Sequence, residues 1–289
     1  MVSNSSRLSS VKLRCPAKIN LYLAVGKSRS DGFHEISTVF QTIDFYDDLF
    51  VKHDTRKLYF KCNTSLRWDK ENTLYKVIEQ IESEIDRRIE IGLELKKRIP
   101  SGAGLGGGSS DAAALLKYLA GLFKIDEERV LRIASNVGSD VPFFLKGGTA
   151  IASGRGEILS FPGDVSGYSV ELSFPGIEVS TPLAYEFIDE DNPELHLDCE
   201  MAEKYYLALK SHDIEAVRRM SYNTFEKSIF DRFPMIRDCH SMLSNKNGGA
   251  IKTMMTGSGS AIFSLFEGCK GRYSFVTSEE LNEKWCSMV

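Results

Sequence analysis

The sequence predicts a mixed α/β protein that is long enough for two domains. Apolar and polar residues alternate over 11–25 and again over 89–95, which is the period of half-buried strands. Between them, residues 72–85 carry apolar side chains at helical spacing. The chain has 289 residues, which allows one large or two medium domains with a sizeable buried core.

The domain boundaries are predicted from composition. The polar residues 1–10 are expected to form a disordered arm. Residues 160–166 are rich in proline, glycine and serine, and we expect them to separate a first domain at 11–161 from a second at 162–289. No apolar run reaches the ~20 residues of a membrane span, and the polar start has no apolar segment typical of a secretory signal.

Charge and cysteine usage narrow the classes of protein. The net charge is −4 and the basic residues are scattered, which argues against nucleic-acid binding. The six cysteines form no C-x-x-C pair, which is typical of reduced thiols in a cytoplasmic protein. We therefore expect a cytoplasmic protein that binds neither nucleic acid nor a membrane. Without a pattern in the sequence that decides either point, we also expect a small-molecule partner and a monomer or weak homodimer.

The first predicted strand, 11–25, contains a break at Pro16 and carries two polar candidates. Lys18 and Asn20 lie two residues apart and so point to the same side, opposite the apolar residues. A lysine beside an asparagine is a candidate for a binding or catalytic site. A solvent-facing strand surface is the alternative, and the pattern alone favours it.

Further strands are expected at 36–45 and 49–61, after a turn at Asp31-Gly32. The turn presents Phe33 and His34 together. Such a pair can stack on a flat ring and hydrogen-bond its edge, although a lone histidine is more often structural.

Asn72 is predicted to cap the helix at 72–85. The strand at 89–95 is followed by the basic run Lys96-Lys97-Arg98, which suits a phosphate-rich ligand or a solvated strand end. Next comes a loop with five glycines and, at its end, two adjacent serines. Its candidate ligand-binding residues are Pro100, Gly102, Gly104, Leu105, Gly106, Gly107, Gly108, Ser109 and Ser110.

This strand, loop and helix start predict an anion site. Glycines let the backbone approach a phosphate, and the helix N-terminus adds partial positive charge. Ser109 and Ser110 are expected to cap the helix that begins near Asp111, and a serine hydroxyl there is a candidate ligand of phosphate or Mg²⁺. The loop is not a Walker A motif, and its match to G-x-G-x-x-G is weak because glycine-dense loops contain it by chance. A flexible linker is the alternative.

A helix starting near Asp126 is followed by Asp140, which stands between a Gly-Ser turn and an apolar run. A carboxylate at the edge of apolar surroundings is a candidate general base; an Asx-turn or helix cap is the alternative. Pro142 argues against a smooth helix there. Residues 147–157 are predicted to form a strand and a tight turn.

In the second half, 168–174 is a predicted strand, and Thr181 and Pro182 are expected at the N-cap and first position of a helix. Several helices are expected across 200–244. Near the end, a second glycine loop at 255–261 links two short apolar segments.

Two of these stretches resemble motifs of the GHMP kinase superfamily. Pro100–Ala113 resembles its phosphate loop, and Thr256–Ser260 resembles its C-terminal glycine motif. Three further motifs, Pro16–Leu21, Asp31–Glu35 and Gly138–Phe144, are similar to those of the 4-diphosphocytidyl-2-C-methyl-D-erythritol kinase family. The resemblance implies a two-domain α/β sandwich with the active site in the cleft. It also implies ATP-dependent phosphorylation of the 2-hydroxyl of a cytidine-diphosphate-linked methylerythritol, by direct in-line transfer with ATP and Mg²⁺, in the non-mevalonate isoprenoid pathway.

The resemblance also assigns roles. It implies that Asp140 is the base for the acceptor hydroxyl and Lys18 its partner, and that Asn20 orients the acceptor. Phe33, where a tyrosine is common, and His34 match the cytosine-recognition pair. The remaining implied contacts are Tyr185 as the opposing aromatic, Asn72 near adenine, Ser110 near Mg²⁺, and Thr181, Gly257, Ser258 and Gly259 around the acceptor.

Two alternatives stay open. Another GHMP kinase, of the homoserine or mevalonate type, has an acceptor without a nucleobase, so Phe33, His34 and Tyr185 argue against it. A non-catalytic ligand sensor with the same fold would not need Lys18 and Asp140.

Overall fold

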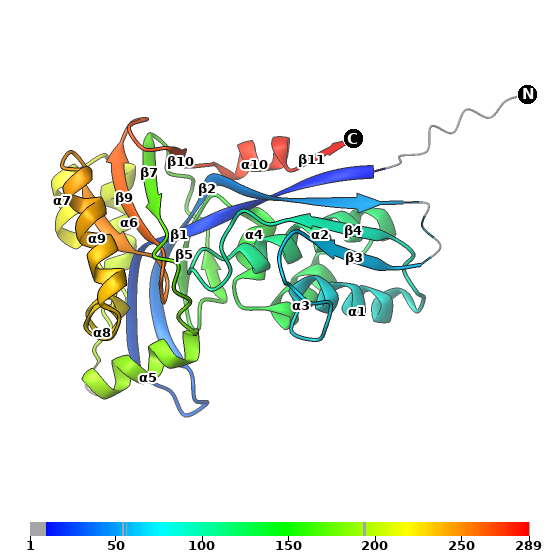
Figure 1. The fold of residues 1–289 in the computed structure, drawn as a ribbon, viewed down its shortest axis with the longest axis horizontal. Helices are drawn as coiled ribbons and strands as arrows, with labels where there is room; N and C mark the ends of the chain where they lie inside the picture. The colour runs from blue at the N-terminus through cyan, green and yellow to red at the C-terminus, as the bar shows by residue number, and fades with distance from the viewer. Residues whose placement is uncertain (1–9, 54, 56, 193–194, 289) are drawn as a thin grey trace, which may run out of the picture.

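The structure is a computed structural model that describes residues 10–53, 55, 57–192 and 195–288. Figure 1 shows two layered regions joined by a pair of long strands. The expected N-terminal arm at 1–10 lies outside the described residues except for Ser10, which already belongs to the first strand and pairs with Lys52.

The first region contains both strands and helices. In chain order they are β1 (Ser10–Ser28), β2 (His34–Lys52), β3 (Tyr59–Cys62), α1 (Thr73–Ile85), β4 (Gly92–Lys96), α2 (Gly107–Phe123), α3 (Glu127–Val137), α4 (Val141–Lys146), β5 (Thr149–Ser153) and β6 (Ile158–Ser160).

The second region contains a helical stretch between strands. Its elements are β7 (Tyr168–Ser173), α5 (Thr181–Asp191), α6 (Met201–Lys210), α7 (Ile214–Met220), α8 (Phe225–Arg232), α9 (Pro234–Lys246), β8 (Lys252–Met255), β9 (Ile262–Glu267), β10 (Tyr273–Ser274), α10 (Ser278–Lys284) and β11 (Cys286–Met288).

Two sheets organise these elements. The larger has the order β11-β1-β2-β4-β3, with β5 paired to β2 and β6 to β5, and α2 packs against β1 and β2. The smaller has the order β10-β7-β9-β8, and α9 packs against it (Figure 1). The last strand, β11, returns to the larger sheet and pairs antiparallel with β1. β6 ends at Ser160 and β7 begins at Tyr168; the boundary at 161/162 stays a prediction.

The antiparallel pair of β1 and β2 connects the hydrophobic cores. Leu13 packs in the core formed with α1, α2 and β4, whereas Ile19 packs in the core formed with α6 and β9. Leu23, nearer the end of β1, belongs to a third core beneath α5, α8 and α9. All three cores contain apolar side chains of β1. The β1 residues between Leu13 and Leu23 therefore lie where the two regions meet.

The strand predictions need three corrections. β2 is one strand from His34 to Lys52, so the break expected at 46–48 is wrong; Asp47 and Asp48 are buried inside it. The single strand expected at 49–61 is also wrong, because 49–52 belongs to β2 and Tyr59 begins the separate strand β3. The break at Pro16 is a shift in register between Pro16 and Ala17, and the strand continues through it. An irregular register tolerates a proline that cannot donate a ladder hydrogen bond.

Three helix starts also differ from expectation. α2 begins at Gly107 with Gly106 as its N-cap, so Ser109 and Ser110 lie inside its first turn and do not cap it. Pro142 sits in the first turn of α4, where its missing N–H breaks no helical bond, so it does not prevent a helix. The N-cap of α5 is Ser180 rather than Thr181.

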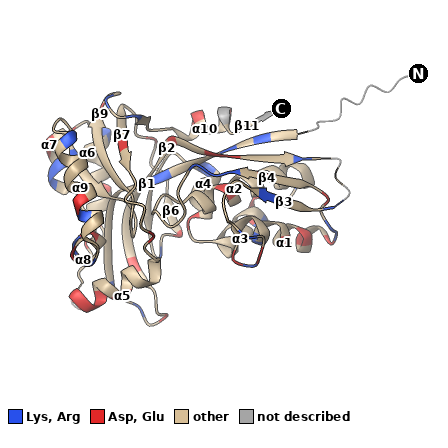
Figure 2. Ribbon diagram, viewed as in Figure 1, with Lys and Arg blue, Asp and Glu red and all other residues tan. Residues whose placement is uncertain are grey.

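Other local predictions are confirmed. Asn72 accepts hydrogen bonds from the backbone N–H groups of Leu74 and Tyr75, and Asp126 caps α3 through Arg129. The second glycine loop joins β8 to β9 as expected. Acidic and basic residues are intermixed along the ribbon of both regions (Figure 2). None of the helices in the described part of the chain combines the length and apolar character that crossing a membrane requires.

Candidate active site

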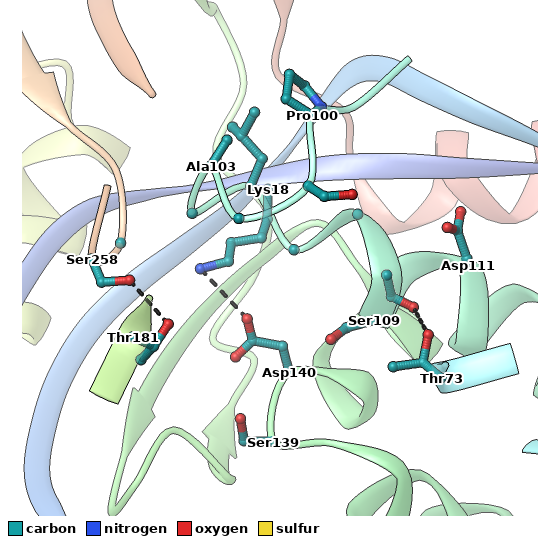
Figure 3. A pocket seen from close by; sticks show the side chains of 18 of the residues that line it. Lys18, Thr73, Pro100, Ala103, Ser109, Asp111, Ser139, Asp140, Thr181 and Ser258 are labelled. Carbon is teal, nitrogen blue, oxygen red and sulfur yellow. Dashed lines mark hydrogen bonds and ion pairs between the residues drawn. The ribbon is translucent and has the colours of Figure 1, made fainter. Parts of the chain in front are cut away.

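A cavity of about 460 Å³, here called the loop hollow, opens where the first glycine loop meets β1 and the start of α4 (Figure 3). It collects residues that are widely separated in the sequence. The predicted site residues that line it are Lys18, Asn20, Asn72, Pro100, Gly102, Gly104, Leu105, Gly106, Gly107, Gly108, Ser109, Asp140, Thr181, Tyr185, Gly257 and Ser258.

The glycine loop has a backbone that other residues rarely adopt. Gly104 and Gly106 have φ of 76° and 69°, in the left-handed region. A Cβ on Gly104 would lie 2.2 Å from the carbonyl oxygen of Thr256, so a side chain would also collide with the second glycine loop. The first N–H groups of α2 have no partner within the helix, and the first turn of α2 lines the hollow. The arrangement suits a bound phosphate.

The two serines of the loop have different environments. The Ser109 side chain points toward the Asp140 carboxylate across the loop hollow (Figure 3). Ser110 is 1% exposed, its hydroxyl has no hydrogen-bond partner among the described residues, and it is absent from the lining of the hollow. Ser109 is therefore better placed than Ser110 to reach a ligand there.

Lys18 and Asn20 are buried, so the solvent-facing alternative is wrong. The Lys18 ammonium donates a hydrogen bond to Asn20 Oδ1 at 2.7 Å and lies 3.6 Å from Asp140 Oδ2. The Asn20 amide nitrogen donates to Thr38 Oγ1 at 2.9 Å, which fixes the orientation of the amide. Asp140 stands at the start of α4 but its side chain caps no backbone N–H. Its carboxylate is 28% exposed and open to the hollow.

The second glycine loop contacts the first. Asn20 N donates to Thr256 Oγ1 at 2.9 Å, and Ala261 N donates to Ala103 O at 3.2 Å. Gly257 and Ser258 line the loop hollow. Gly259 does not line it, and a Cβ there would lie 2.7 Å from the sulfur of Met255.

Asn223 also holds the second glycine loop, and sequence reasoning missed it. It is 3% exposed, and its amide donates to the carbonyl oxygens of Met255 at 2.8 Å and Gly257 at 2.9 Å. No local pattern marks this asparagine, because its partners lie more than 30 residues further along the chain.

A second cavity of about 710 Å³, here called the aromatic hollow, adjoins the loop hollow and is lined by Phe33, His34 and Tyr185. Phe33 is 52% exposed, so one ring is open to a ligand. The His34 ring stacks on Tyr185, with centroids 4.7 Å apart and planes inclined by 23°, and His34 Nε2 lies 2.8 Å from Asp189 Oδ1. Burial raises the pKa of Tyr185 to about 12. Thr181 lines both hollows, and its hydroxyl is 3.1 Å from that of Ser258.

Beneath the first glycine loop lies a buried charge cluster, defined here as Asp47, Lys97 and Asp111. The Lys97 ammonium bonds to Asp47 Oδ2 and, at 3.0 Å, to Asp111 Oδ2. Asp47 Oδ1 accepts from the backbone N–H groups of Arg98 and Ile99, at 2.5 and 2.9 Å. The chain segment that enters the loop is thereby fastened to β2.

The buried charge cluster has a perturbed titration. Burial raises the pKa of Asp111 to about 7; the negative charge of Asp47 adds to the shift and Lys97 opposes it. Within the basic run the Lys97 side chain is 6% exposed and lines the loop hollow, which fits the ligand-facing alternative. Lys96 and Arg98 are exposed, which fits the solvated alternative. The signal available in the sequence was the pair Asp47-Asp48 inside an otherwise apolar stretch.

Comparison with known proteins agrees with this geometry. Residues 72–148 match the GHMP kinases N terminal domain, and residues 206–270 match the GHMP kinases C terminal domain. A homoserine kinase from Cytophaga hutchinsonii has the same fold, with a TM-score of 0.68 and 18% identity over 98% of this chain and 91% of that one. The fold and the glycine-loop site define the class: the chain is a GHMP kinase.

More similar relatives narrow the family. The 4-diphosphocytidyl-2-C-methyl-D-erythritol kinase of Thermotoga maritima is 44% identical over 92% of this chain and 96% of its own length; that of Thermotoga petrophila is 43% identical over 96% and 99%. A crystal structure of 4-(cytidine 5'-diphospho)-2C-methyl-D-erythritol kinase superposes with a TM-score of 0.74 and 33% identity, over 89% of this chain and 90% of that one. The chain belongs to the 4-diphosphocytidyl-2-C-methyl-D-erythritol kinase family.

Proposed function

We propose that the protein transfers the γ-phosphoryl group of ATP to the 2-hydroxyl of 4-diphosphocytidyl-2-C-methyl-D-erythritol, a step of the non-mevalonate isoprenoid pathway. The observation that carries the proposal is the Lys18–Asp140 pair, with 3.6 Å between Nζ and Oδ2, at the junction of a glycine-loop cavity and an aromatic cavity. A donor and an acceptor that fill the two cavities would meet at this pair.

The loop hollow suits ATP. The N–H groups at the start of α2 would hold the β- and γ-phosphates, where the partial positive charge of the helix terminus favours an anion. Asn72 lines the same cavity, but its side chain is already engaged as the cap of α1 and by Arg67 O at 2.7 Å. Asn72 would therefore form part of the wall of an adenine site, while its amide stays bonded to α1 and to Arg67 O.

Lys18 and Asp140 divide the chemistry of the acceptor hydroxyl. Asp140 accepts the proton as the oxygen attacks phosphorus, and the bond from the γ-phosphorus to the bridging oxygen breaks, leaving ADP. The Lys18 ammonium lowers the pKa of the hydroxyl and stabilises negative charge on the phosphoryl group in flight. Asn20, whose amide Thr38 orients, would fix the acceptor through its diol. No enzyme nucleophile is required.

Ser109, whose side chain faces the loop hollow, would help to hold Mg²⁺ there (Figure 3). A hydroxyl oxygen is a ligand that Mg²⁺ accepts alongside waters and phosphate oxygens. When bound, the ion neutralises charge on the phosphates. The resemblance placed Ser110 near Mg²⁺. Ser110 is 1% exposed and does not line the loop hollow, so it could bind the ion only if the start of α2 moved.

The aromatic hollow suits the cytosine. Phe33 offers an exposed ring for stacking, and Tyr185 stands on the side shared with the loop hollow. His34 is held against both Tyr185 and Asp189, so its ring orientation is set before a base enters. The acceptors of homoserine and mevalonate kinases carry no nucleobase, so they have no flat ring that could stack in a cavity lined by Phe33, His34 and Tyr185.

The test is an ADP-release assay with ATP·Mg²⁺ and one of three acceptors. We expect turnover with 4-diphosphocytidyl-2-C-methyl-D-erythritol and none above background with homoserine or mevalonate. Turnover with homoserine or mevalonate, but not with the cytidine-linked acceptor, would instead favour a homoserine kinase or a mevalonate kinase. Folded protein that binds ATP but releases no ADP with any of the three would support a ligand sensor. The cytoplasmic location and the monomer or weak homodimer remain predictions.

A further inference from the structure

Arg155 occupies a position between the two hollows that the reaction chemistry above does not use. It follows β5 in a Gly-Arg-Gly turn and lines both the loop hollow and the aromatic hollow. Ser139 and Thr181 also line both cavities, and in Figure 3 Thr181 is drawn to the left of Asp140 and Ser139 below it. A ligand group bound by Arg155 would therefore lie between the aromatic hollow and the Lys18–Asp140 pair.

The turn that carries Arg155 is anchored to the beginning of β2. Gly154 N donates to Glu35 Oε1 at 2.9 Å, and Ile36 N donates to Gly154 O at 2.7 Å. The Arg155 guanidinium carbon lies 4.6 Å from the centroid of the Phe33 ring. The same two strands thus place a cation beside the exposed aromatic ring.

Charge in the aromatic hollow is unbalanced. Glu157, Glu186 and Asp189 line it, and among its described lining residues Arg155 is the only lysine or arginine. The two lysines that line the loop hollow already have acidic partners, since Lys18 lies beside Asp140 and Lys97 is held by Asp47 and Asp111. A polyanionic ligand crossing from one cavity to the other would meet three carboxylates and one cation, Arg155, whose ion pair with Glu157 is long at 3.6 Å.

The guanidinium is only loosely engaged. Arg155 Nε lies 3.6 Å from Glu157 Oε1, beyond hydrogen-bond distance, and its side chain is 45% exposed. In the described part of the chain, no hydrogen bond donated by the guanidinium is found. Its N–H donors are therefore open to an anion, and a guanidinium binds phosphate oxygens in a planar, two-point geometry.

We infer that Arg155 binds the diphosphate of the acceptor and selects for acceptors that carry one. This inference rests on the proposed function, because a cytidine held at Phe33 would place its diphosphate toward the cavity junction. A bound phosphate would draw the Arg155 guanidinium away from Glu157. The Phe33 ring would then keep the guanidinium at the junction of the two hollows.

The test compares the binding of two probes, cytidine 5'-diphosphate and cytidine, by calorimetry with wild type, Arg155→Met and Arg272→Met. We expect Arg155→Met to lower the affinity for cytidine 5'-diphosphate about tenfold, because one exposed charge-assisted contact is lost. The affinity for cytidine should stay within about twofold of the wild-type value. Arg272 is a matched control because it is an exposed arginine whose guanidinium carbon lies 5.3 Å from the centroid of the Tyr273 ring, outside both hollows. Arg272→Met should change neither affinity.

Unchanged diphosphate affinity in Arg155→Met would overturn the inference. Equal weakening of both probes would also overturn it, because the arginine would then act through packing on Phe33. Retained cytidine binding shows that the variant is folded. Kinetics give an independent readout: in Arg155→Met the KM for the acceptor should rise about tenfold while kcat and the KM for ATP stay within about twofold. If the wild type binds the diphosphate through Arg155 but turns over no acceptor, the proposed function fails and this inference stands.

Discussion

The two sides of the cleft are built by different means. The donor side is mainly backbone: a glycine loop and the first turn of one helix, supported from below by the buried charge cluster. The acceptor side is mainly side chains, contributed by β1, the β1–β2 turn, the start of α4, the turn after β5 and α5. Lys18 and Asp140 stand where the two meet.

This difference explains what each side tolerates. A backbone site depends on φ angles and close approaches, so substitutions there act through strain and through whatever holds the loop. A side-chain site depends on single functional groups, so substitutions there remove chemistry or affinity and leave the fold intact. Four variants test this contrast, taken from the largest expected effect to the smallest.

Asp140→Asn should remove the acceptor-side base and leave both binding sites in place. We expect kcat to fall by about 10²–10⁴-fold, the usual contribution of a positioned general base, with the KM for ATP and for the acceptor changed less than about threefold. Steady-state kinetics with ADP release measure all three. Asp238→Asn, at an exposed carboxylate on α9, is the control and should match wild type. A kcat near that of wild type in Asp140→Asn would remove Asp140 from the chemistry.

Lys97→Met should damage the donor side from below. It leaves Asp47 and Asp111 buried without their cation, and breaking such a pair costs about 3–5 kcal/mol. We expect the free energy of unfolding in urea to fall by that amount. Lys96→Met, at the exposed neighbour, should change it by less than about 0.5 kcal/mol. Equal stability of the two variants would show that the cluster does not support the loop.

Gly104→Ala should strain the contact between the two glycine loops. The φ of 76° and the 2.2 Å approach to Thr256 O both oppose a Cβ. We expect a loss of about 1–3 kcal/mol in unfolding free energy and a rise in the KM for ATP that exceeds the rise in the KM for the acceptor. Gly121→Ala, in α2 with open space around it, should stabilise by up to about 1 kcal/mol. A larger effect on the acceptor than on ATP would contradict the division of the cleft.

Asp111→Asn should alter how stability depends on pH. Because the folded pKa of Asp111 is raised to about 7, the folded protein keeps this proton between pH 4 and 7 where the unfolded chain has released it. This carboxyl therefore makes the wild type less stable as pH rises through that range. The unfolding free energy of Asp111→Asn minus that of wild type should increase from pH 4 to pH 7, by roughly 1–3 kcal/mol. A difference that is flat or falls with pH would contradict the raised pKa.

Local signals predicted much of the donor side. Asn72 was identified as a cap, and a helix start was expected near Asp126, because both signals depend only on the first turn of the helix concerned. The phosphate loop was predicted because glycines and a following helix are adjacent in sequence. The start of α2 was missed since glycine has low helix propensity, and tertiary contacts override it: Thr73 Oγ1 donates to Gly108 O at 2.7 Å.

The acceptor side was predicted mainly through resemblance, because its geometry depends on distant partners. Lys18 is buried by distant partners that its own strand does not reveal: its backbone N–H donates to Leu105 O at 3.0 Å, and its ammonium lies 4.8 Å from the centroid of the Phe40 ring. The choice of Ser180 over Thr181 as cap reflects two adjacent residues of similar capping preference, with Thr181 drawn to Ser258 instead. Arg155 and Asn223 carried no motif, since an arginine in a turn and an asparagine between helices are ordinary residues in a sequence.

The central claim is that the Lys18–Asp140 pair directs the γ-phosphoryl group to a hydroxyl of the cytidine-linked acceptor and not to water. Phosphorus NMR of a reaction with ATP·Mg²⁺ and 4-diphosphocytidyl-2-C-methyl-D-erythritol tests it most directly. We predict one new phosphomonoester resonance on the acceptor, equal in amount to the ADP formed, with the acceptor diphosphate retained. ADP accompanied only by inorganic phosphate, or loss of the acceptor diphosphate, would contradict the account.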